Sequence, residues 1–166
     1  MPAQKIYLLV HSIRSCHNVG SILRSADAFG IKEVIFSGYT PYPHMPNDSR
    51  LPHISKKLHA QIQKTALGAE KSVAWRHSDD IVSEIAALKD QGVRVIALEQ
   101  APHSVSLVGY VPHSDIALLL GEEVAGIAPQ LQALCDQVIE IPMLGEKESL
   151  NVSVAAAIAM YQLANH

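Results

Sequence analysis

Cysteine, aromatic residues and long apolar runs are all scarce in this sequence. Its 166 residues include two cysteines, Cys16 and Cys135, which match neither a disulfide framework nor a CxxC redox or zinc motif. No stretch approaches the roughly 18 consecutive apolar residues that a membrane span needs. The longest candidate, residues 152–160, lies at the wrong end of the chain for a signal peptide. We therefore expect a cytoplasmic protein that does not enter a membrane.

Two common nucleotide-binding motifs are missing as well. The sequence contains neither GxGxxG ahead of a helix nor GxxxxGK[ST], which counts against a dinucleotide-binding dehydrogenase and a P-loop NTPase. Its nine histidines form no HExxH or other close metal-ligand spacing, so we expect no metal site. A Cys16–His17 nucleophile pair is disfavoured because neighbours in sequence rarely point at each other.

The length and composition are those of one globular domain. The chain is 48% apolar and 17% charged, and it is long enough to form a sizeable core. Its formal net charge of −3 conceals a basic stretch between residues 50 and 77, in which only Glu70 is acidic. Such a stretch either contacts phosphates or is an ordinary solvated helix face. Its basic residues are Arg50, Lys56, Lys57, Lys64, Lys71 and Arg76.

Short apolar runs rich in β-branched residues alternate with helical patterns along the whole chain. Runs such as "IALLL" are apolar at every position, which is typical of strands buried on both faces of a parallel sheet. The sequence therefore predicts an α/β fold, a single domain over residues 1–166 with a mostly parallel sheet flanked by helices. The predicted strands are 6–10, 34–37, 73–75, 93–98, 116–120 and 138–141, and the predicted helices are 19–29, 54–66, 81–91, 129–134 and 152–163.

Three of the predicted strands end in unusual loops. The strands ending at residues 98, 120 and 141 are followed by "EQAPHS", "GEEVAGI" and "PMLGEKESLN". Ligands of open α/β sheets bind beyond the carboxyl ends of the strands, so we expect a binding site there. Glu122 and Glu123 resemble a carboxylate pair, but adjacent side chains diverge, and at most one of them is expected to face that site.

The stretch "HNVGSILRSADAFG" combines a predicted Asn18–Gly20 turn with an amphipathic helix. Ile22, Ala26 and Phe29 form the apolar stripe, and Arg24 lies about 200° round from Ile22 at 100° per residue. Arg24 is therefore expected to point away from the core. By periodicity alone it is a solvated charge.

Three segments together resemble the SpoU-type RNA 2′-O-ribose methyltransferases of the TrmH family, within the SPOUT superfamily. "NVGSILRSADAFG" resembles their N-x-G-x-x-x-R motif, "LLLGEEVAGI" their G-x-E-x-x-G motif, and "IPMLGEKESLNVSVAAAIAMY" their I-P-M-x-G-x-x-x-S-L-N-V-S-x-A motif. "KTALGAEK", at 64–71, is also similar to a segment of members that act on tRNA. The motifs occur in family order and span most of the chain.

The resemblance implies a fold, a cofactor and an assembly. Members of the family have a deep C-terminal trefoil knot, which general topology rules would reject, and they bind S-adenosyl-L-methionine in the three strand-end loops. They are usually homodimers, and the first and last helices are candidate interface elements, although simple core packing explains the same residues. The cofactor contacts implied by the resemblance are Ala97, Leu98, Gly121, Ile141, Met143, Ser149 and Leu150.

The resemblance also implies catalytic roles. The resemblance places Arg24 at the catalytic centre, where the family's arginine often serves as the general base. We expect Arg24 instead to grip an RNA phosphate and to stabilise the developing alkoxide, because a guanidinium with a pKa above about 12 is a poor base. Asn18 would position Arg24 or the substrate, and Gly20 would keep the turn close to it. Glu123 would orient Arg24 or a nearby backbone group. Ser149 and Asn151 would hold the third loop and the reacting ribose.

This sequence departs from the family at a few positions. "SCH" at residues 15–17 replaces a segment in which a proline is frequent, and Glu122 and Lys147 also differ from the usual residue types. These departures concern substrate contacts and leave His17 open as a base.

We expect no separate RNA-binding domain in this sequence, and we therefore expect the methyltransferase domain itself to bind RNA. The resemblance predicts S-adenosylmethionine-dependent methylation of a ribose 2′-hydroxyl, with tRNA favoured over rRNA. A non-catalytic RNA-binding protein that retains the fold is the alternative from another class. The residues expected to contact RNA are Arg24, Arg50, Lys56, Lys57 and Lys64.

Overall fold

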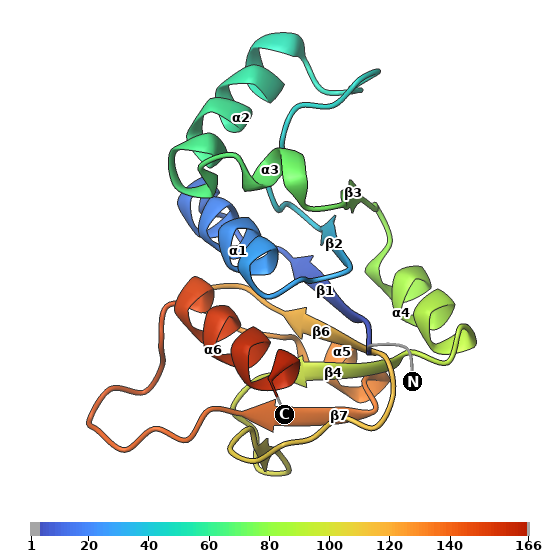
Figure 1. The fold of residues 1–166 in the computed structure, drawn as a ribbon, viewed down its shortest axis with the longest axis vertical. Coiled ribbons are helices and arrows are strands. Elements are labelled where there is room, and N and C mark those ends of the chain that lie inside the picture. Colours follow the sequence, from blue (N-terminus) through green and yellow to red (C-terminus); the bar gives the residue numbers. More distant parts are fainter. Residues whose placement is uncertain (1–3, 166) are drawn as a thin grey trace.

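Seven parallel strands form the centre of the computed structural model, which describes residues 4–165 (Figure 1). They lie in the order β3-β2-β1-β6-β4-β7-β5, and every neighbouring pair is parallel. Their carboxyl ends therefore meet along one edge of the sheet. The strands are β1 Ile6–His11, β2 Glu33–Ser37, β3 Trp75–His77, β4 Arg94–Leu98, β5 Val105–Ser106, β6 Ile116–Leu120 and β7 Gln137–Glu140.

Helices cover both faces of this sheet. α1, α2, α3 and α6 lie on one face, and α4 and α5 lie on the other (Figure 1). α2 and the loop before it rise from one end of the sheet, whereas the segment between β7 and α6 forms a long loop at its side. The helices are α1 Cys16–Ala28, α2 Pro52–Ala66, α3 Ala69–Ser72, α4 Ile81–Asp90, α5 Pro129–Leu134 and α6 Val152–Ala164.

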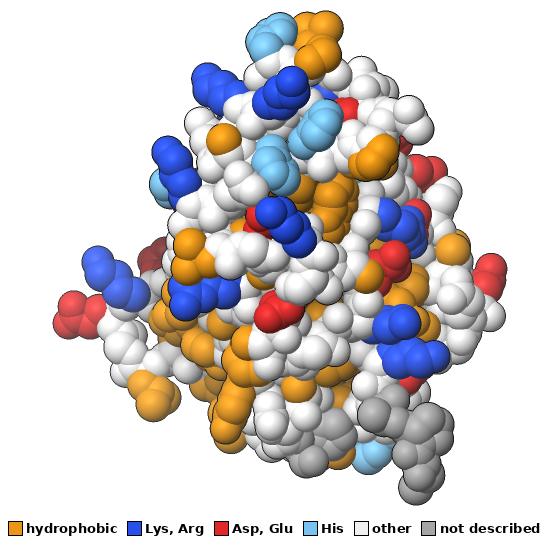
Figure 2. Space-filling model, turned by 45° about the horizontal axis from the view of Figure 1, so that its top comes forward, with side chains coloured by type: hydrophobic (Ala, Val, Ile, Leu, Met, Phe, Trp, Pro, Cys, Tyr) orange, Lys and Arg blue, Asp and Glu red, His pale blue; other side chains and the backbone are white. Residues whose placement is uncertain are grey.

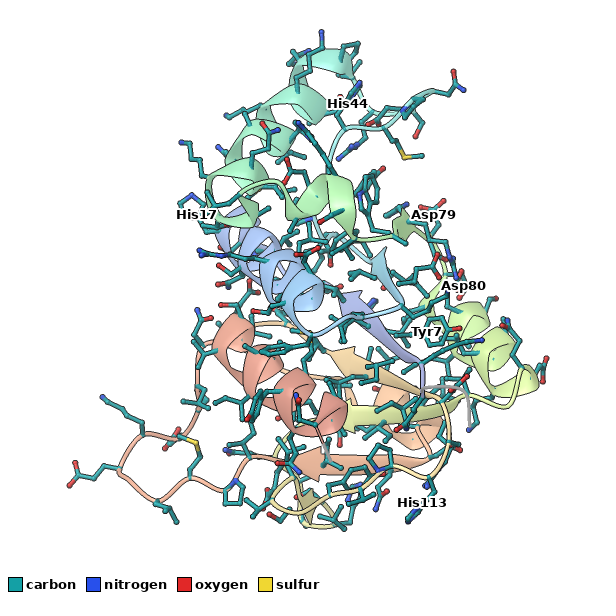
Figure 3. The ribbon with its side chains drawn as sticks, in the orientation of Figure 1. Tyr7, His17, His44, Asp79, Asp80 and His113 are labelled. Carbon is teal, nitrogen blue, oxygen red and sulfur yellow. The ribbon has the colours of Figure 1, made fainter. Side chains whose placement is uncertain are left out.

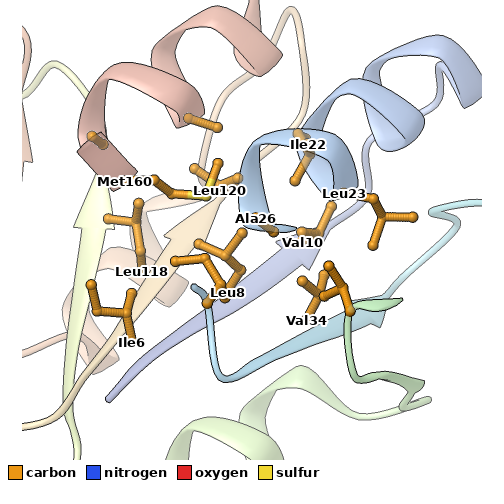
Figure 4. Close-up of a cluster of buried hydrophobic side chains, with 14 of the residues drawn as sticks. Ile6, Leu8, Val10, Ile22, Leu23, Ala26, Val34, Leu118, Leu120 and Met160 are labelled. Carbon is orange, nitrogen blue, oxygen red and sulfur yellow. The ribbon is translucent and has the colours of Figure 1, made fainter. Parts of the chain in front are cut away.

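The core consists of two apolar layers, one on each side of the sheet. Alternate residues of β1 supply both, since Leu8 and Val10 pack under α1 and α6 while Leu9 packs on the α4 side (Figure 4). All five residues of β6 are buried, as expected of a central parallel strand. Met160 brings α6 onto the first layer.

The predicted fold class is confirmed, with a few differences in the elements. Two short elements, β5 and α3, were not predicted, because two strand residues and one helical turn leave no periodic pattern. β3 lies at Trp75–His77 rather than 73–75, since Val73 packs into the core instead. The trefoil knot stays a prediction.

The expected Asn18–Gly20 turn is wrong. α1 already begins at Cys16, because Ser15 caps it by accepting a hydrogen bond from the Asn18 backbone N–H at 3.2 Å. Gly20 lies inside the helix, where a Cβ would sit 2.9 Å from the Ala66 nitrogen and closer still to Thr65 Oγ1. The glycine therefore lets α1 and α2 pack together and does not form a turn beside Arg24.

Candidate functional site

A pocket opens where β6, β4 and β7 end side by side. Its cavity volume is about 160 Å³, and it is open to solvent on one side. Leu98 and Glu99 enter it from the end of β4, and Glu140 and Ile141 enter it from the end of β7. The pocket was expected at these strand ends.

Most of the predicted cofactor contacts line this pocket. Ala97 does not, because its side chain is fully buried in the core layer on the α4 side. Ser149 lies on the wall, but its side chain makes no hydrogen bond in the described part of the chain. The predicted residues on the wall are Leu98, Gly121, Ile141, Met143, Ser149 and Leu150.

Gly121 is required by the shape of the wall. A Cβ at this position would lie 2.6 Å from the Gly126 carbonyl oxygen and 2.6 Å from Ile127. The backbone of the "GEEVAG" loop closes on itself here, since Glu122 and Gly126 exchange hydrogen bonds of 3.1 and 2.9 Å. Because Gly121 has no side chain, the backbone of this loop forms that side of the pocket.

Four carboxylates line the pocket, and only one of them, Glu123, was among the predicted site residues. Glu99 Oε2 accepts a hydrogen bond from the Ile127 N–H at 2.9 Å, and its Oε1 accepts one from the Gln100 N–H at 2.9 Å. Glu99 thereby ties the end of β4 to the "GEEVAG" loop. Its place as the first residue after a buried strand was the available signal. Glu122 and Glu123 both line the pocket, so the expectation that at most one of them faces it is wrong, and Glu99 and Glu140 line it as well.

Glu123 connects the second motif to the first. Its carboxylate accepts hydrogen bonds from the backbone N–H groups of Arg14 and Ser15, both at 3.1 Å, and from Asn18 Nδ2 at 3.3 Å. Burial alone raises the pKa of this carboxyl, but these donors outweigh it and lower the pKa below its ordinary value. Glu123 is therefore an anion that fixes the start of α1 and does not contact Arg24.

Asn18 and Asn151 extend this connection to the third motif. Asn151 Nδ2 donates to Asn18 Oδ1 at 3.1 Å, and Asn151 Oδ1 caps α6 by accepting from the Ser153 N–H at 2.9 Å. One continuous set of hydrogen bonds thus runs Glu123–Asn18–Asn151. Three residues predicted from separate motifs are brought together.

Arg24 and His17 lie apart from this set. Arg24 is exposed on α1, as its periodicity predicted, and it has no hydrogen bond or ion pair within residues 4–165. His17 lies near the start of α1, where its carbonyl accepts a hydrogen bond from Thr65 Oγ1 at 2.8 Å (Figure 3). Neither side chain lines the pocket.

Some cations of the basic stretch 50–77 form no ion pair, whereas others are paired with carboxylates. Lys56, Lys57 and Lys64 are exposed on α2 and form no ion pair in the described structure. Figure 2 shows lysine, arginine and histidine side chains gathered over this part of the molecule. Arg76, by contrast, pairs with Glu84 at 2.6 Å. The three lysines form the basic α2 face.

Arg50 is occupied inside the loop that precedes α2. Its guanidinium donates to both Asp48 oxygens, at 2.9 and 2.6 Å, and to the carbonyls of Tyr42 and Pro43, both at 2.8 Å. Only 16% of its side chain is exposed. The structure thus gives Arg50 a loop-anchoring role that uses four of its five guanidinium N–H groups, and its contact with RNA stays a prediction.

Asp48 makes the stability of this loop dependent on pH. Its side chain is 3% exposed, and the hydrogen bonds from Arg50 hold the pKa of its carboxyl well below the ordinary range. A lowered folded-state pKa stabilises the protein above the unfolded-state value of about 3.9 and loses this effect as the pH falls further.

We expect Asp48→Asn to lower the free energy of unfolding by about 1–3 kcal/mol at pH 7, because a buried guanidinium loses its anion. The difference from the unsubstituted protein should shrink as the pH falls below about 4. Denaturant unfolding of both proteins between pH 7 and pH 3 measures it. A difference that stays constant over this range would contradict the assignment.

Within 4–165, no group of three histidine, cysteine or acidic residues is arranged to hold a metal ion. No helix in the same range is both long and apolar enough to cross a membrane.

Comparison with known proteins identifies relatives along nearly the whole chain. The model of the SpoU rRNA Methylase family matches residues 5–161. The 23S rRNA (guanosine-2′-O-)-methyltransferase RlmB of Bordetella pertussis is 32% identical over 158 residues, which cover 95% of this chain and 58% of that protein. The tRNA (guanosine(18)-2′-O)-methyltransferase of Escherichia coli K12 is 31% identical over 153 residues, which cover 92% of this chain and 60% of that protein. The chain thus spans less than two thirds of the length of these relatives.

A solved structure shows the same fold. The SpoU methyltransferase AviRb of Streptomyces viridochromogenes, in complex with the cofactor AdoMet, superposes with a TM-score of 0.79 at 22% identity. The superposition covers 99% of this chain and 61% of that one.

Proposed function

The chain belongs to the SpoU rRNA methylase family, and from this premise we propose that it transfers a methyl group from S-adenosylmethionine to a ribose 2′-hydroxyl of RNA. The observation that carries the proposal is the set of hydrogen bonds Glu123–Asn18–Asn151. It joins all three family motifs at the mouth of a pocket lined by six of the seven expected cofactor contacts.

The residues of the pocket suit this cofactor. S-adenosylmethionine carries a positively charged sulfonium and an ammonium group, and the four carboxylates on the wall favour a cation over a nucleoside phosphate. Leu98, Leu120 and Ile141 supply apolar surface for an adenine ring, and the backbone around Gly121 supplies hydrogen-bonding groups. When bound, the cofactor supplies an electrophilic methyl group.

Arg24 is proposed to hold the RNA phosphate and to stabilise negative charge that develops on the 2′-oxygen. A free guanidinium outside the pocket fits this role in a dimer, where the site of one copy receives Arg24 from the other. α6 supports such an assembly, because it is apolar all round and still exposes Val154, Ile158 and Tyr161. In this proposal, solvent or His17 removes the proton of the 2′-hydroxyl. A pH–rate profile without an ionisation in the histidine range argues against His17.

Among RNAs, we propose tRNA as the substrate. The 64–71 segment resembles members that act on tRNA, and it forms a compact corner between α2 and α3. Glu70 closes this corner by accepting hydrogen bonds from the Gly68 N–H at 3.0 Å and from Gln63 Nε2 at 3.1 Å. The similarity to an rRNA methyltransferase makes rRNA the second candidate.

The decisive experiment incubates the protein with labelled S-adenosylmethionine and separately with total tRNA and total rRNA, and then maps the labelled ribose. Label in tRNA supports the proposal, and label in rRNA alone moves the substrate to the second candidate. Calorimetry with S-adenosylmethionine is run in parallel. A protein that binds RNA but neither binds the cofactor nor transfers label is the non-catalytic alternative.

We expect the pair Lys56→Glu and Lys57→Glu to weaken RNA binding and to flatten its salt dependence, because two phosphate contacts are lost from the basic α2 face. Titrations with RNA at salt concentrations from about 50 to about 200 mM measure the affinity and its salt dependence. Lys32→Glu is the control substitution, because Lys32 is exposed and forms no ion pair within residues 4–165. Unchanged RNA binding in the double variant would make the basic α2 face an ordinary solvated surface.

A further inference from the structure

Arg14 and Tyr39 form a paired surface beside the pocket that the proposed function does not use. The Arg14 guanidinium carbon lies 5.0 Å from the centre of the Tyr39 ring. Arg14 is exposed, and 49% of Tyr39 is exposed. An exposed tyrosine with an arginine over its ring is a surface on which a flat aromatic ligand can stack.

This surface is held in place by buried contacts. Arg14 follows β1 and Tyr39 follows β2, and the two loops run side by side because the Ser12 N–H donates to the Ser37 carbonyl at 3.1 Å. Thr40, which is 3% exposed, clamps them together. Its Oγ1 accepts from the Ile13 N–H at 3.1 Å and donates to the Val10 carbonyl at 3.1 Å. The pair is therefore preorganised by its supporting backbone.

The position of the surface relates it to the pocket. A second groove, lined by Arg14, Ser15, Asn18 and the residues 122–124, adjoins the first pocket and shares Glu122, Glu123 and Val124 with it. The carboxyl ends of β2, β1 and β6 thus carry, in order, Tyr39, Arg14 and the wall common to both cavities. A nucleotide whose ribose lies at the common wall extends its base along the groove toward Arg14 and Tyr39.

We propose that Arg14 and Tyr39 form a subsite for an unpaired nucleobase of the RNA, on which the base of the nucleotide to be methylated stacks. This inference rests on the proposed function for the identity of the nucleotide. Unpaired bases are recognised by stacking on aromatic rings and guanidinium planes, and this recognition tolerates any base. A side-chain hydrogen bond with Tyr39 raises the pKa of the Arg14 guanidinium most, and the negative charge of Glu122 raises it further. An anion beside Arg14 disfavours a phosphate at this point, which is why a base is the better occupant.

The first test needs no methyl transfer. A short oligouridine carrying one central 2-aminopurine is titrated with the full chain, and its fluorescence is expected to fall when the reporter base stacks. Tyr39→Phe should retain this quenching and Tyr39→Ala should lose it. Arg14→Lys should weaken it, because lysine keeps the charge without the planar group. Absence of quenching by the unsubstituted protein, or equal quenching by Tyr39→Ala, overturns the subsite.

The second test uses the RNA identified by labelled methyl transfer, with and without the base of the target nucleotide. Tyr39→Ala should lower kcat/KM by about one to two orders of magnitude on the intact RNA and much less on the abasic RNA. The two losses should therefore not add. Additive losses overturn the subsite. The affinity for S-adenosylmethionine should be unchanged in Tyr39→Ala, because Tyr39 does not line the cofactor pocket. If the unsubstituted protein neither binds the cofactor nor transfers methyl groups, the proposed function fails, and the fluorescence result still decides the subsite.

Discussion

Replacement of Arg24 by alanine is expected to lower the rate of methyl transfer by at least about 10²–10³-fold, the typical effect of removing one group that stabilises a developing oxyanion. The affinity for S-adenosylmethionine should stay the same. Arg24 is exposed, lies outside the pocket and forms no hydrogen bond or ion pair within residues 4–165, so its loss should leave the fold and the cofactor pocket intact. Single-turnover transfer measures the first effect, and calorimetry with the cofactor measures the second.

Two further variants test whether Arg24 acts through charge or through bidentate geometry, and whether the site is shared between two copies. Arg24→Lys keeps the charge but not the bidentate geometry, and it should recover only part of the rate. Gly121→Val should close the cofactor pocket, because the Gly126 backbone is only 2.6 Å from the added Cβ. If Arg24 serves the pocket of a second copy, mixing Arg24→Ala with Gly121→Val protein restores activity that neither has alone. Substantial turnover by pure Arg24→Ala protein would remove Arg24 from the reaction.

The strand-end loops were the part of the site that the sequence predicted best. A parallel sheet places all carboxyl ends at one edge, so loops far apart in the sequence had to meet there once the strands were recognised. Leu98, Gly121 and Ile141 therefore line one pocket as expected. The Ala97 side chain does not line the pocket, because adjacent strand residues face opposite sides of the sheet, and its contact with the cofactor stays a prediction.

What the sequence did not predict is mostly the partner of each polar group. Periodicity placed Arg24 on the exposed side of α1, but it gave no sign that Glu123 receives the backbone N–H groups of Arg14 and Ser15. From the sequence alone, Arg50 is expected to be a surface cation. In the structure, four hydrogen bonds hold its guanidinium within one loop. Hydrogen-bond partners separated by a hundred residues leave no local pattern in the sequence.

Gly20→Ala is expected to destabilise the fold by about 1–3 kcal/mol, the usual cost of overpacking a tight contact. That loss lowers Tm by about 2–4 °C per kcal/mol in a chain of this length. In an open helix the same substitution would stabilise the protein by up to about 1 kcal/mol, because alanine is the better helix former. The sign therefore reports the contact, which consists of Thr65 Oγ1, the Ile62 carbonyl and, at 2.9 Å, the Ala66 nitrogen. Thermal and denaturant unfolding measure it.

The same variant decides between two explanations of the motif glycine. If Gly20 serves the contact between α1 and α2, the substitution lowers stability and RNA affinity together, since α2 carries Lys56, Lys57 and Lys64. If Gly20 instead shapes a turn near Arg24, the rate of methyl transfer falls while the unfolding free energy does not. Gly145→Ala is the control for the unfolding measurement alone, because nothing lies within 4 Å of its added Cβ and its φ is not positive, whereas its loop carries expected cofactor contacts. If the Gly20→Ala protein is stable but transfers methyl groups slowly, Gly20 acts in the active site. If the protein is destabilised, the packing of α1 against α2 explains why the motif has a glycine at this position.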